Sequence, residues 1–187
     1  MNEFAELGLA GARVDRIARR AKVNKAMIYY HFASKEDLYQ KVIEGEMERL
    51  IALFQVQIEE VRDTEELLLA LSENYYNLFG ADNKFGPIAI REMASGGKRL
   101  KAAMVNLVAK RGLPGKLKRI IDQGKRDGHY RDIDSRQALI SFISMNLFYL
   151  VMAPVVNAVW EIKDDKKFRK ERPQAVVDLF MRGLEAR

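Results

Sequence analysis

The hydrophobic positions of this chain recur with the spacing of amphipathic helices along nearly its whole length. Val14, Ile17, Ala18 and Ala21 follow the i, i+3, i+4, i+7 spacing that places one apolar stripe on a helix. No stretch alternates apolar and polar residues as a half-buried strand would. The pattern predicts an all-α protein, with helices over about residues 14–21, 25–31, 35–61, 63–79, 87–94, 100–111, 115–127, 135–152 and 173–185 and a loop over residues 80–86.

Capping residues and prolines mark the ends of these helices. Asn24 is suited to cap the helix over 25–31, because its side chain can accept a hydrogen bond from a free amide of the first turn. Ser34 followed by Asp37 predicts a capping box at the start of the next helix. Each proline is expected near a helix boundary: Pro87, Pro114, Pro154 and Pro173.

The helix expected over residues 135–152 is apolar on nearly every side, which indicates burial on every side. In a chain of 187 residues, that requires the chain's own body on one side and a second subunit on the other. Together with the helix over 173–185, it could form a four-helix dimer interface. The alternative is that both helices only close the core of the monomer.

Composition narrows the class of protein. The chain has no cysteine, so disulfides, thiolate metal sites and cysteine nucleophiles are excluded, and this fits the reducing cytoplasm. No run of 18 apolar residues predicts a membrane span, and the N-terminus lacks a signal-peptide pattern. The net charge of +6 is unevenly distributed: residues 36–82 carry −9 and residues 98–131 carry +9.

The segment from Arg13 to Lys35 combines short helices with concentrated positive charge. It holds seven basic residues and one acidic residue, a net charge of +6. Two short helices, a tight turn and this charge predict a helix-turn-helix, whose second helix enters the major groove of double-stranded DNA. An ordinary basic surface on a helical hairpin is the alternative. The second helix presents outward Lys25, Ala26, Met27, Tyr30 and His31, with Tyr29 to one side.

From this face we expect a division of roles in DNA binding. Met27, Tyr30 and His31 are nearest the bases. Contacts to phosphate are expected from four other residues, which would set the register of the protein on the duplex: Arg13, Asn24, Tyr29 and Lys35.

The run V-D-R-I-A-R-R-A-K-V-N-K-A-M-I-Y-Y-H-F-A-S-K-E-D-L resembles the DNA-binding head of the TetR/AcrR family of bacterial repressors. The family pattern is matched by Lys25, Ile28, Tyr29, His31, Phe32, Ser34, Lys35, Glu36 and Leu38, and Phe4 to Val14 resembles the family's entry segment. The resemblance implies a head over residues 1–36, a ligand-binding and dimerisation body over residues 37–187, and a homodimer formed through the last two long helices.

The sequence departs from the family pattern at three places. Only Met1 to Leu7 stand where the family has a full first helix, so the head is expected to be truncated or shortened, with part of its core exposed. Ala12 and Arg13 replace two hydroxyl residues. Lys22 replaces the glycine of the turn, where a left-handed conformation would strain lysine.

Candidate effector-binding residues are aromatic, methionine and amide side chains on the apolar faces of the body, although core packing is the commoner role for each. They are Tyr75, Tyr76, Phe79, Met93, Met104, Phe142, Met145, Asn146 and Tyr149. The basic block at 98–131 could attract an anionic ligand, or it could be a solvated helix face. No metal, cofactor or catalytic constellation is found, because the two histidines, His31 and His129, have no suitable neighbours in the sequence.

These observations predict a sequence-specific transcriptional regulator, a homodimer released from a near-palindromic DNA operator by an unknown small-molecule effector. The alternative is a dimeric helical ligand-binding protein that lacks specific DNA binding, and the short N-terminal helix is what favours it.

Overall fold

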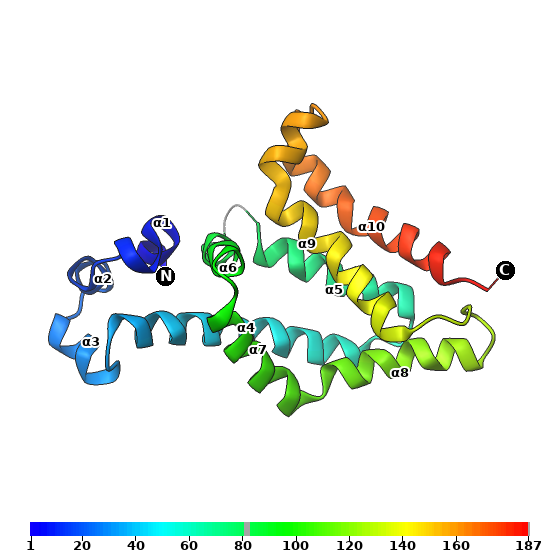
Figure 1. The fold of residues 1–187 in the computed structure, drawn as a ribbon, viewed down its shortest axis with the longest axis horizontal. Coiled ribbons are helices and arrows are strands. Elements are labelled where there is room, and N and C mark those ends of the chain that lie inside the picture. The colour runs from blue at the N-terminus through cyan, green and yellow to red at the C-terminus, as the bar shows by residue number, and fades with distance from the viewer. Residues whose placement is uncertain (81–82, 187) are drawn as a thin grey trace. The chain divides into compact units, whose positions relative to one another are not determined.

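The computed structural model describes residues 1–80 and 83–186, apart from the side chains of residues 109 and 110. The described residues contain no β-strand, only an isolated antiparallel bridge between Tyr130 and Glu185, so the all-α prediction is confirmed (Figure 1). The helices are α1 (Asn2–Gly11), α2 (Val14–Ala21), α3 (Lys25–His31), α4 (Lys35–Glu60), α5 (Thr64–Leu78), α6 (Phe85–Ala94), α7 (Lys98–Arg111), α8 (Leu113–Arg126), α9 (Ser135–Val159) and α10 (Asp165–Leu184).

The chain divides into two compact units, and α4 contributes to both. The first unit comprises Met1–Ile51 and Leu78–Lys110, and the second comprises Ala52–Asn77 and Arg111–Arg187. The head predicted over residues 1–36 lies within the first unit.

The first unit packs α1 against α6. Arg91 of α6 donates hydrogen bonds from Nη1 to the carbonyl oxygens of Phe4 (3.2 Å) and Ala5 (2.6 Å). Phe4 is 1 % exposed, and its ring meets that of Tyr39 edge-on at a centroid distance of 4.9 Å. The short first helix was expected to leave part of the core of the head exposed, but at Phe4 this core is buried. Gly8 bends α1 with φ 67° and ψ −178°, a conformation open essentially to glycine alone.

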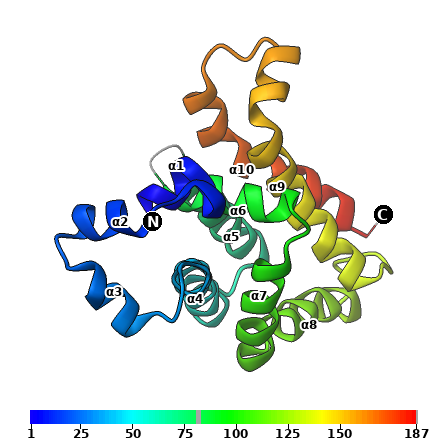
Figure 2. The ribbon, with the colours of Figure 1, turned by 60° about the vertical axis from the view of Figure 1, so that its left-hand side comes forward.

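The second unit has its core between α5, α8, α9 and α10. Helices α9 and α10 lie side by side and antiparallel (Figures 1 and 2). The core side chains are aliphatic and aromatic: Leu67, Leu68, Leu71, Ile121, Ala138, Phe142, Val176, Val177, Phe180 and Leu184. Burial of these side chains supplies most of the stabilisation of the unit, because each buried large apolar side chain contributes roughly 1.5–3 kcal/mol.

Several predicted helix ends were wrong, most clearly at two prolines. Pro154 and Pro173 lie inside helices, so α9 continues to Val159 and α10 already begins at Asp165. A proline within a helix costs about 3 kcal/mol, which burial of neighbours such as Ala153 (1 % exposed) helps to offset. Helix α10 begins after Asp164, which caps it by accepting a hydrogen bond from the amide of Lys167 at 2.9 Å. The sequence analysis did not recognise this capping residue and placed the start at Pro173.

The remaining helix ends differ from expectation by about two residues. Helices α6, α7 and α8 each begin two residues before the predicted position. Part of the loop predicted over residues 80–86 lies outside the described residues, and its last two residues belong to α6.

Candidate nucleic-acid interface

A small hydrophobic cluster holds α2 and α3 together. Val14, Ala18 and Ile28 are buried, and the half-buried Ile17, Phe32 and Leu38 pack against them. The helical spacing predicted Val14, Ile17 and Ala18 correctly, whereas the fourth position of that stripe, Ala21 in the last turn of α2, is exposed. Because so few side chains form this core, the orientation of α3 depends also on the turn that precedes it.

The turn between α2 and α3 has a left-handed residue at Lys22, the position where lysine replaces the glycine of the family pattern. Lys22 has φ 55° and ψ 38°, where a glycine would be unstrained. The amide of Val23 donates to the carbonyl of Ala18 at 3.0 Å and closes the end of α2. Asn24 accepts a hydrogen bond from the amide of Ala26 at 2.9 Å, as a capping residue should.

Helix α3 exposes the face that the sequence assigns to DNA. Tyr30 is 82 % exposed, Met27 51 % and Tyr29 47 %, and the side chains of Lys25, Ala26 and His31 are also exposed. The rings of Tyr30 and His31 meet edge-on at a centroid distance of 5.0 Å. In the ribbon, α2 and α3 lie at one end of the first unit, with α3 at its rim (Figure 2).

Both lysines among the predicted DNA contacts have partners within the protein. Lys25 Nζ lies 2.9 Å from Asp15 Oδ1, and this exposed ion pair raises the pKa of Lys25 and lowers that of Asp15. Lys35 Nζ donates to the carbonyl oxygens of Ala10 (3.3 Å) and Ala12 (3.1 Å), and so ties the end of α1 to the start of α4. An ammonium group has three protons, so these contacts leave capacity for a phosphate.

A buried glutamate, missed by the sequence analysis, fixes two arginines of α2. Glu3 is 2 % exposed, and its carboxylate lies 3.3 Å from Arg16 Nε and 3.7 Å from Arg20 Nη1. Arg20 also forms two parallel bonds of 3.0 Å to Glu6. The signal in the sequence was two acids spaced i, i+3 in α1 and two arginines spaced i, i+4 in α2, which one helix-to-helix contact can pair.

The head therefore holds two kinds of basic side chain. Arg16 and Arg20 are committed to acidic partners, whereas Arg13, Arg19 and Lys22 are exposed and form no ion pair with any residue that the structure describes. The charge available to a polyanion is consequently concentrated next to the turn and the start of α2. With the exposed face of α3, this arrangement suits the backbone and the edges of bases in a duplex.

The predicted effector residues divide between the two units. Tyr76, Asn146 and Tyr149 come together in the second unit, where the rings of Tyr76 and Tyr149 stack at 6.5 Å and Asn146 bonds the hydroxyl of Ser72. Tyr75, Phe142 and Met145 also belong to that unit, and Phe142 and Met145 pack in its core. The other three predicted residues belong to the first unit: Phe79, Met93 and Met104.

The tyrosines of this cluster are neutral phenols. Burial raises the pKa of Tyr76 to about 12, with the guanidinium of Arg172 near enough to oppose the shift. Even so, the Tyr76 hydroxyl has no well-formed hydrogen bond to any described residue. Burial and a 2.7 Å hydrogen bond to Asp165 raise the pKa of Tyr149 to about 12.

Comparison with known proteins gives a family match over the head. Residues 1–42 match the family described as "Bacterial regulatory proteins, tetR family". The match covers α1, α2, α3 and the start of α4, the elements that carry the face described above.

Relatives extend the similarity along the chain. The HTH-type transcriptional repressor NicS of Pseudomonas putida is 29 % identical, over 97 % of this chain and 86 % of its own length. The TetR family regulator PfmR of Thermus thermophilus has a similar structure, with a TM-score of 0.68 and 25 % identity over 98 % of this chain and 94 % of its own. FadR of Bacillus subtilis, solved with stearoyl-CoA, shares the fold at a TM-score of 0.69, 22 % identity and coverages of 98 % and 94 %.

Proposed function

The chain belongs to the TetR family of bacterial regulatory proteins and is a DNA-binding transcriptional regulator; we propose that it acts as a cytoplasmic homodimer, released from a near-palindromic operator by a small molecule. The observation that carries the proposal is the exposed face of α3, with Tyr30 82 % exposed, near Arg19 and Lys22, which form no ion pair with any described residue. Met27, Tyr29 and Tyr30 are exposed together on this short helix, and an exposed apolar surface of this kind indicates contact with a partner.

The proposed docking places α3 in a major groove. Met27, Tyr30 and His31 face the base edges, and Lys25 and Ala26 begin the helix that enters the groove. Arg13, Asn24, Tyr29 and Lys35 hold phosphates and set the register. A two-fold dimer would present two such helices, so its operator is a pair of half-sites related by the helical repeat of DNA.

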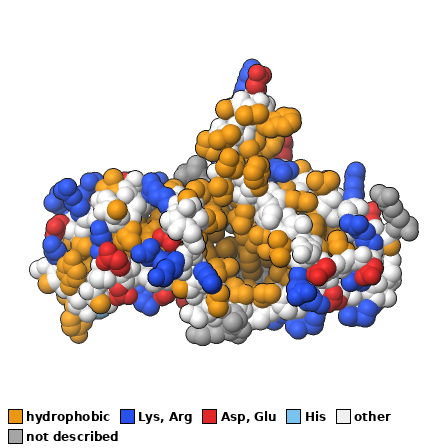
Figure 3. Space-filling model, viewed as in Figure 1, with side chains coloured by type: hydrophobic (Ala, Val, Ile, Leu, Met, Phe, Trp, Pro, Cys, Tyr) orange, Lys and Arg blue, Asp and Glu red, His pale blue; other side chains and the backbone are white. Residues whose placement is uncertain are grey.

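The proposed dimer uses a stripe of exposed apolar side chains on α9. Ile140, Phe148, Val155 and Val159 are 58 %, 64 %, 53 % and 70 % exposed, and Met152 lies between them at 36 %. Their spacing in steps of about four residues or multiples of four puts them on one face of the helix. Hydrophobic side chains gather on this part of the second unit (Figure 3). An exposed apolar surface of this kind indicates an interaction site.

A second copy of the chain explains this stripe better than a lipid bilayer. Helix α9 is long and apolar enough to cross a membrane by length and composition, with a mean hydropathy of 2.0, but a core helix of a soluble protein meets the same test. Its other face already packs in the core of the second unit, through Ala138, Phe142 and Leu150. The proposal therefore assigns the exposed stripe, with Leu179 of α10 (61 % exposed), to the partner subunit.

For the effector, the proposal uses the polar cluster inside the second unit. Tyr76 offers a buried hydroxyl without a well-formed hydrogen bond to any described residue, one turn along α5 from Ser72, which donates to Asn146; Ser72 and Asn146 are both fully buried. An unpaired buried hydroxyl costs about 1–3 kcal/mol, which a ligand that accepts its hydrogen bond would recover. The stearoyl-CoA complex of the Bacillus subtilis protein supports the idea that this fold can accommodate a ligand. Such a ligand changes DNA affinity only by its differential affinity for the two states of the head.

Two variants that introduce the same charge test the proposed assembly. Phe148→Asp puts the charge on the exposed stripe of α9, and Asn106→Asp puts it on an exposed polar position of α7, outside the proposed interface. Sedimentation equilibrium should show a dimer for the wild type and for Asn106→Asp and a monomer for Phe148→Asp, with DNA affinity lost along with the dimer. A Phe148→Asp protein that remains dimeric would contradict this interface.

A further inference from the structure

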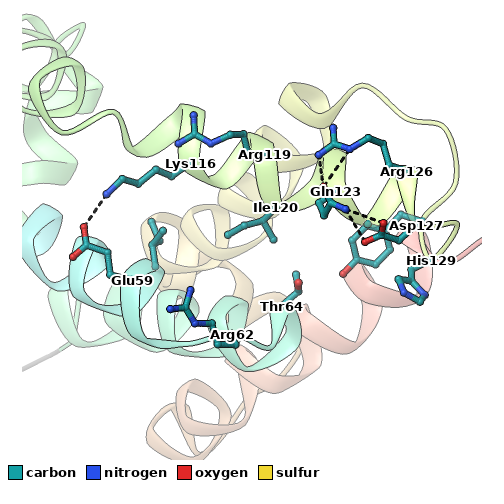
Figure 4. Close-up of a pocket in the computed structure, with 13 residues that line it drawn as sticks. Glu59, Arg62, Thr64, Lys116, Arg119, Ile120, Gln123, Arg126, Asp127 and His129 are labelled. Atoms are coloured by element: carbon teal, nitrogen blue, oxygen red, sulfur yellow. Dashed lines mark hydrogen bonds and ion pairs between the residues drawn. The ribbon is translucent and has the colours of Figure 1, made fainter.

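A groove in the second unit lies apart from the residues assigned to DNA, dimer and effector. It runs between the end of α4 and the start of α5 on one side, and α8 with the segment after it on the other (Figure 4). Its volume is about 800 Å³, in the range of sites that hold small molecules. None of the predicted effector residues lines it.

The charge of the groove is positive and partly uncompensated. Lys116 pairs with Glu59 at 2.8 Å across one end. At the other end the amide of Gln123 donates to Asp127 (2.8 and 3.0 Å), and Arg126 donates to the oxygen of Gln123 (3.2 Å from Nε). The acids of the groove thus already have donors.

Two guanidinium groups in the groove have neither an acidic partner nor a hydrogen-bond acceptor among the described residues. Arg62 and Arg119 are exposed and form no ion pair or hydrogen bond with any residue in the described part of the chain. They come from opposite sides, Arg62 from the connection between α4 and α5 and Arg119 from α8 (Figure 4). An unpaired arginine offers five N–H donors in a planar fork that matches phosphate oxygens.

Two uncharged polar side chains, Thr64 and His129, add to the lining. Thr64, the first residue of α5, lines the groove. The start of α5 adds no anion site of its own, because the carboxylate of Asp63 already accepts a hydrogen bond from the amide of Glu66 at 2.8 Å. His129 lines the end of the groove near Arg126 and supplies two more ring nitrogens.

The rest of the groove is lined by two aliphatic side chains and one aromatic ring. Ile58 and Ile120 are half-buried and face the groove from α4 and α8. The ring of Tyr130 lies directly against the backbone of α8 at Gly124, where a Cβ atom would stand 2.2 Å from two ring carbons. Only glycine at this position lets the ring lie so close, so the groove has a fixed aromatic wall.

We propose that this groove binds a phosphate-bearing small molecule with a planar ring, of the size of a nucleoside monophosphate. Arg119 lies back along α8, so it turns into the groove on binding, which its exposure allows; Arg62 and Arg119 then hold the phosphate, whose two negative charges at neutral pH match the two guanidinium groups. Ile58, Ile120 and Tyr130 contact the ring and the sugar. The site is separate from the proposed effector cluster, so it gives the regulator a second ligand.

The test is calorimetric titration of the full chain, without DNA, with adenosine 5′-monophosphate, adenosine, inorganic phosphate and succinate. We expect adenosine 5′-monophosphate to bind with a Kd of about 1 mM or lower, inorganic phosphate more weakly, and adenosine and succinate not measurably. Equal binding of adenosine would show that the phosphate does not contribute and would contradict the proposal. Equal binding of succinate would show that the site accepts any dianion and would contradict its specificity for phosphate. Absence of binding by adenosine 5′-monophosphate overturns the proposal.

Variants locate the binding. Arg62→Gln and Arg119→Gln should each weaken adenosine 5′-monophosphate about tenfold, the loss expected for one charge-assisted contact. Arg182→Gln, which removes an exposed arginine of α10 outside the groove, should leave binding unchanged. Operator affinity measured on the same proteins should match the wild type, so failure here is distinguishable from failure of the DNA-binding proposal. Wild-type affinity in both groove variants would place the ligand elsewhere and contradict the assignment.

Discussion

Replacing Lys22 by glycine should make the DNA-binding head more stable while removing one of its positive charges. Lys22 occupies the left-handed region at the end of α2, with φ 55° and ψ 38°. Its side chain is exposed and forms no ion pair among the described residues, so the substitution removes little packing. What changes is the backbone, because the left-handed conformation is unstrained only without a Cβ atom.

The magnitude follows from two opposing contributions. A residue with a Cβ atom loses about 1–2 kcal/mol in the left-handed region. Glycine also has greater freedom in the unfolded chain, which lowers the free energy of unfolding by about 0.4–1 kcal/mol. The net gain is about 0.5–1 kcal/mol, which at room temperature slows opening-limited exchange of the amides in α2 and α3 by about two- to fivefold.

Hydrogen exchange measured by mass spectrometry on α2 and α3 reports this change locally. Lys22→Ala is the matched control, because it removes the same charge but keeps the Cβ atom, and its exchange should equal that of the wild type. Both variants should lose DNA affinity to the same extent, since both lose the same charge. Faster exchange in Lys22→Gly, or equal protection in both variants, would refute the strain at this turn.

Three further substitutions test other contacts of the head. Glu3→Ala should destabilise the head by about 2 kcal/mol, less than a fully buried ion pair because Arg16 and Arg20 are 44 % and 41 % exposed; a loss below about 0.5 kcal/mol in urea unfolding would show that Glu3 is dispensable. Tyr30→Ala should lower operator affinity about tenfold in fluorescence anisotropy without affecting folding, and unchanged affinity would remove Tyr30 from the docking. Lys35→Gln should reduce the slope of log affinity against log salt concentration by about 0.9, the value for one phosphate; an unchanged slope would limit Lys35 to its structural contacts.

The sequence predicted the head well because its signals are local. The helical period of Val14, Ile17 and Ala18 and the Asn24 cap each depend on residues within a few positions of one another, and the structure confirms both. The tertiary contacts of the same residues could not be predicted in this way. The Lys35 contacts join residues more than 20 positions apart in the chain, and nothing in the local pattern specifies them.

The body was predicted less accurately because tertiary burial overrides local preference there. Pro154 and Pro173 are helix breakers by local rules, yet both lie within long helices whose neighbouring turns are buried. The groove was missed for a related reason. The sequence shows a basic block at residues 98–131, but only the fold shows that Arg119 has no acidic partner among the described residues and that Arg62, from an acidic segment, shares its groove.

The most direct test of the central claim is selection of bound duplexes from a random DNA pool at two salt concentrations, followed by sequencing. We expect enrichment of a near-palindromic sequence with half-sites related by the helical repeat, and we expect this enrichment to persist at the higher salt concentration. Binding without sequence enrichment, abolished by the higher salt concentration, would show only phosphate attraction and would contradict sequence-specific recognition by α3.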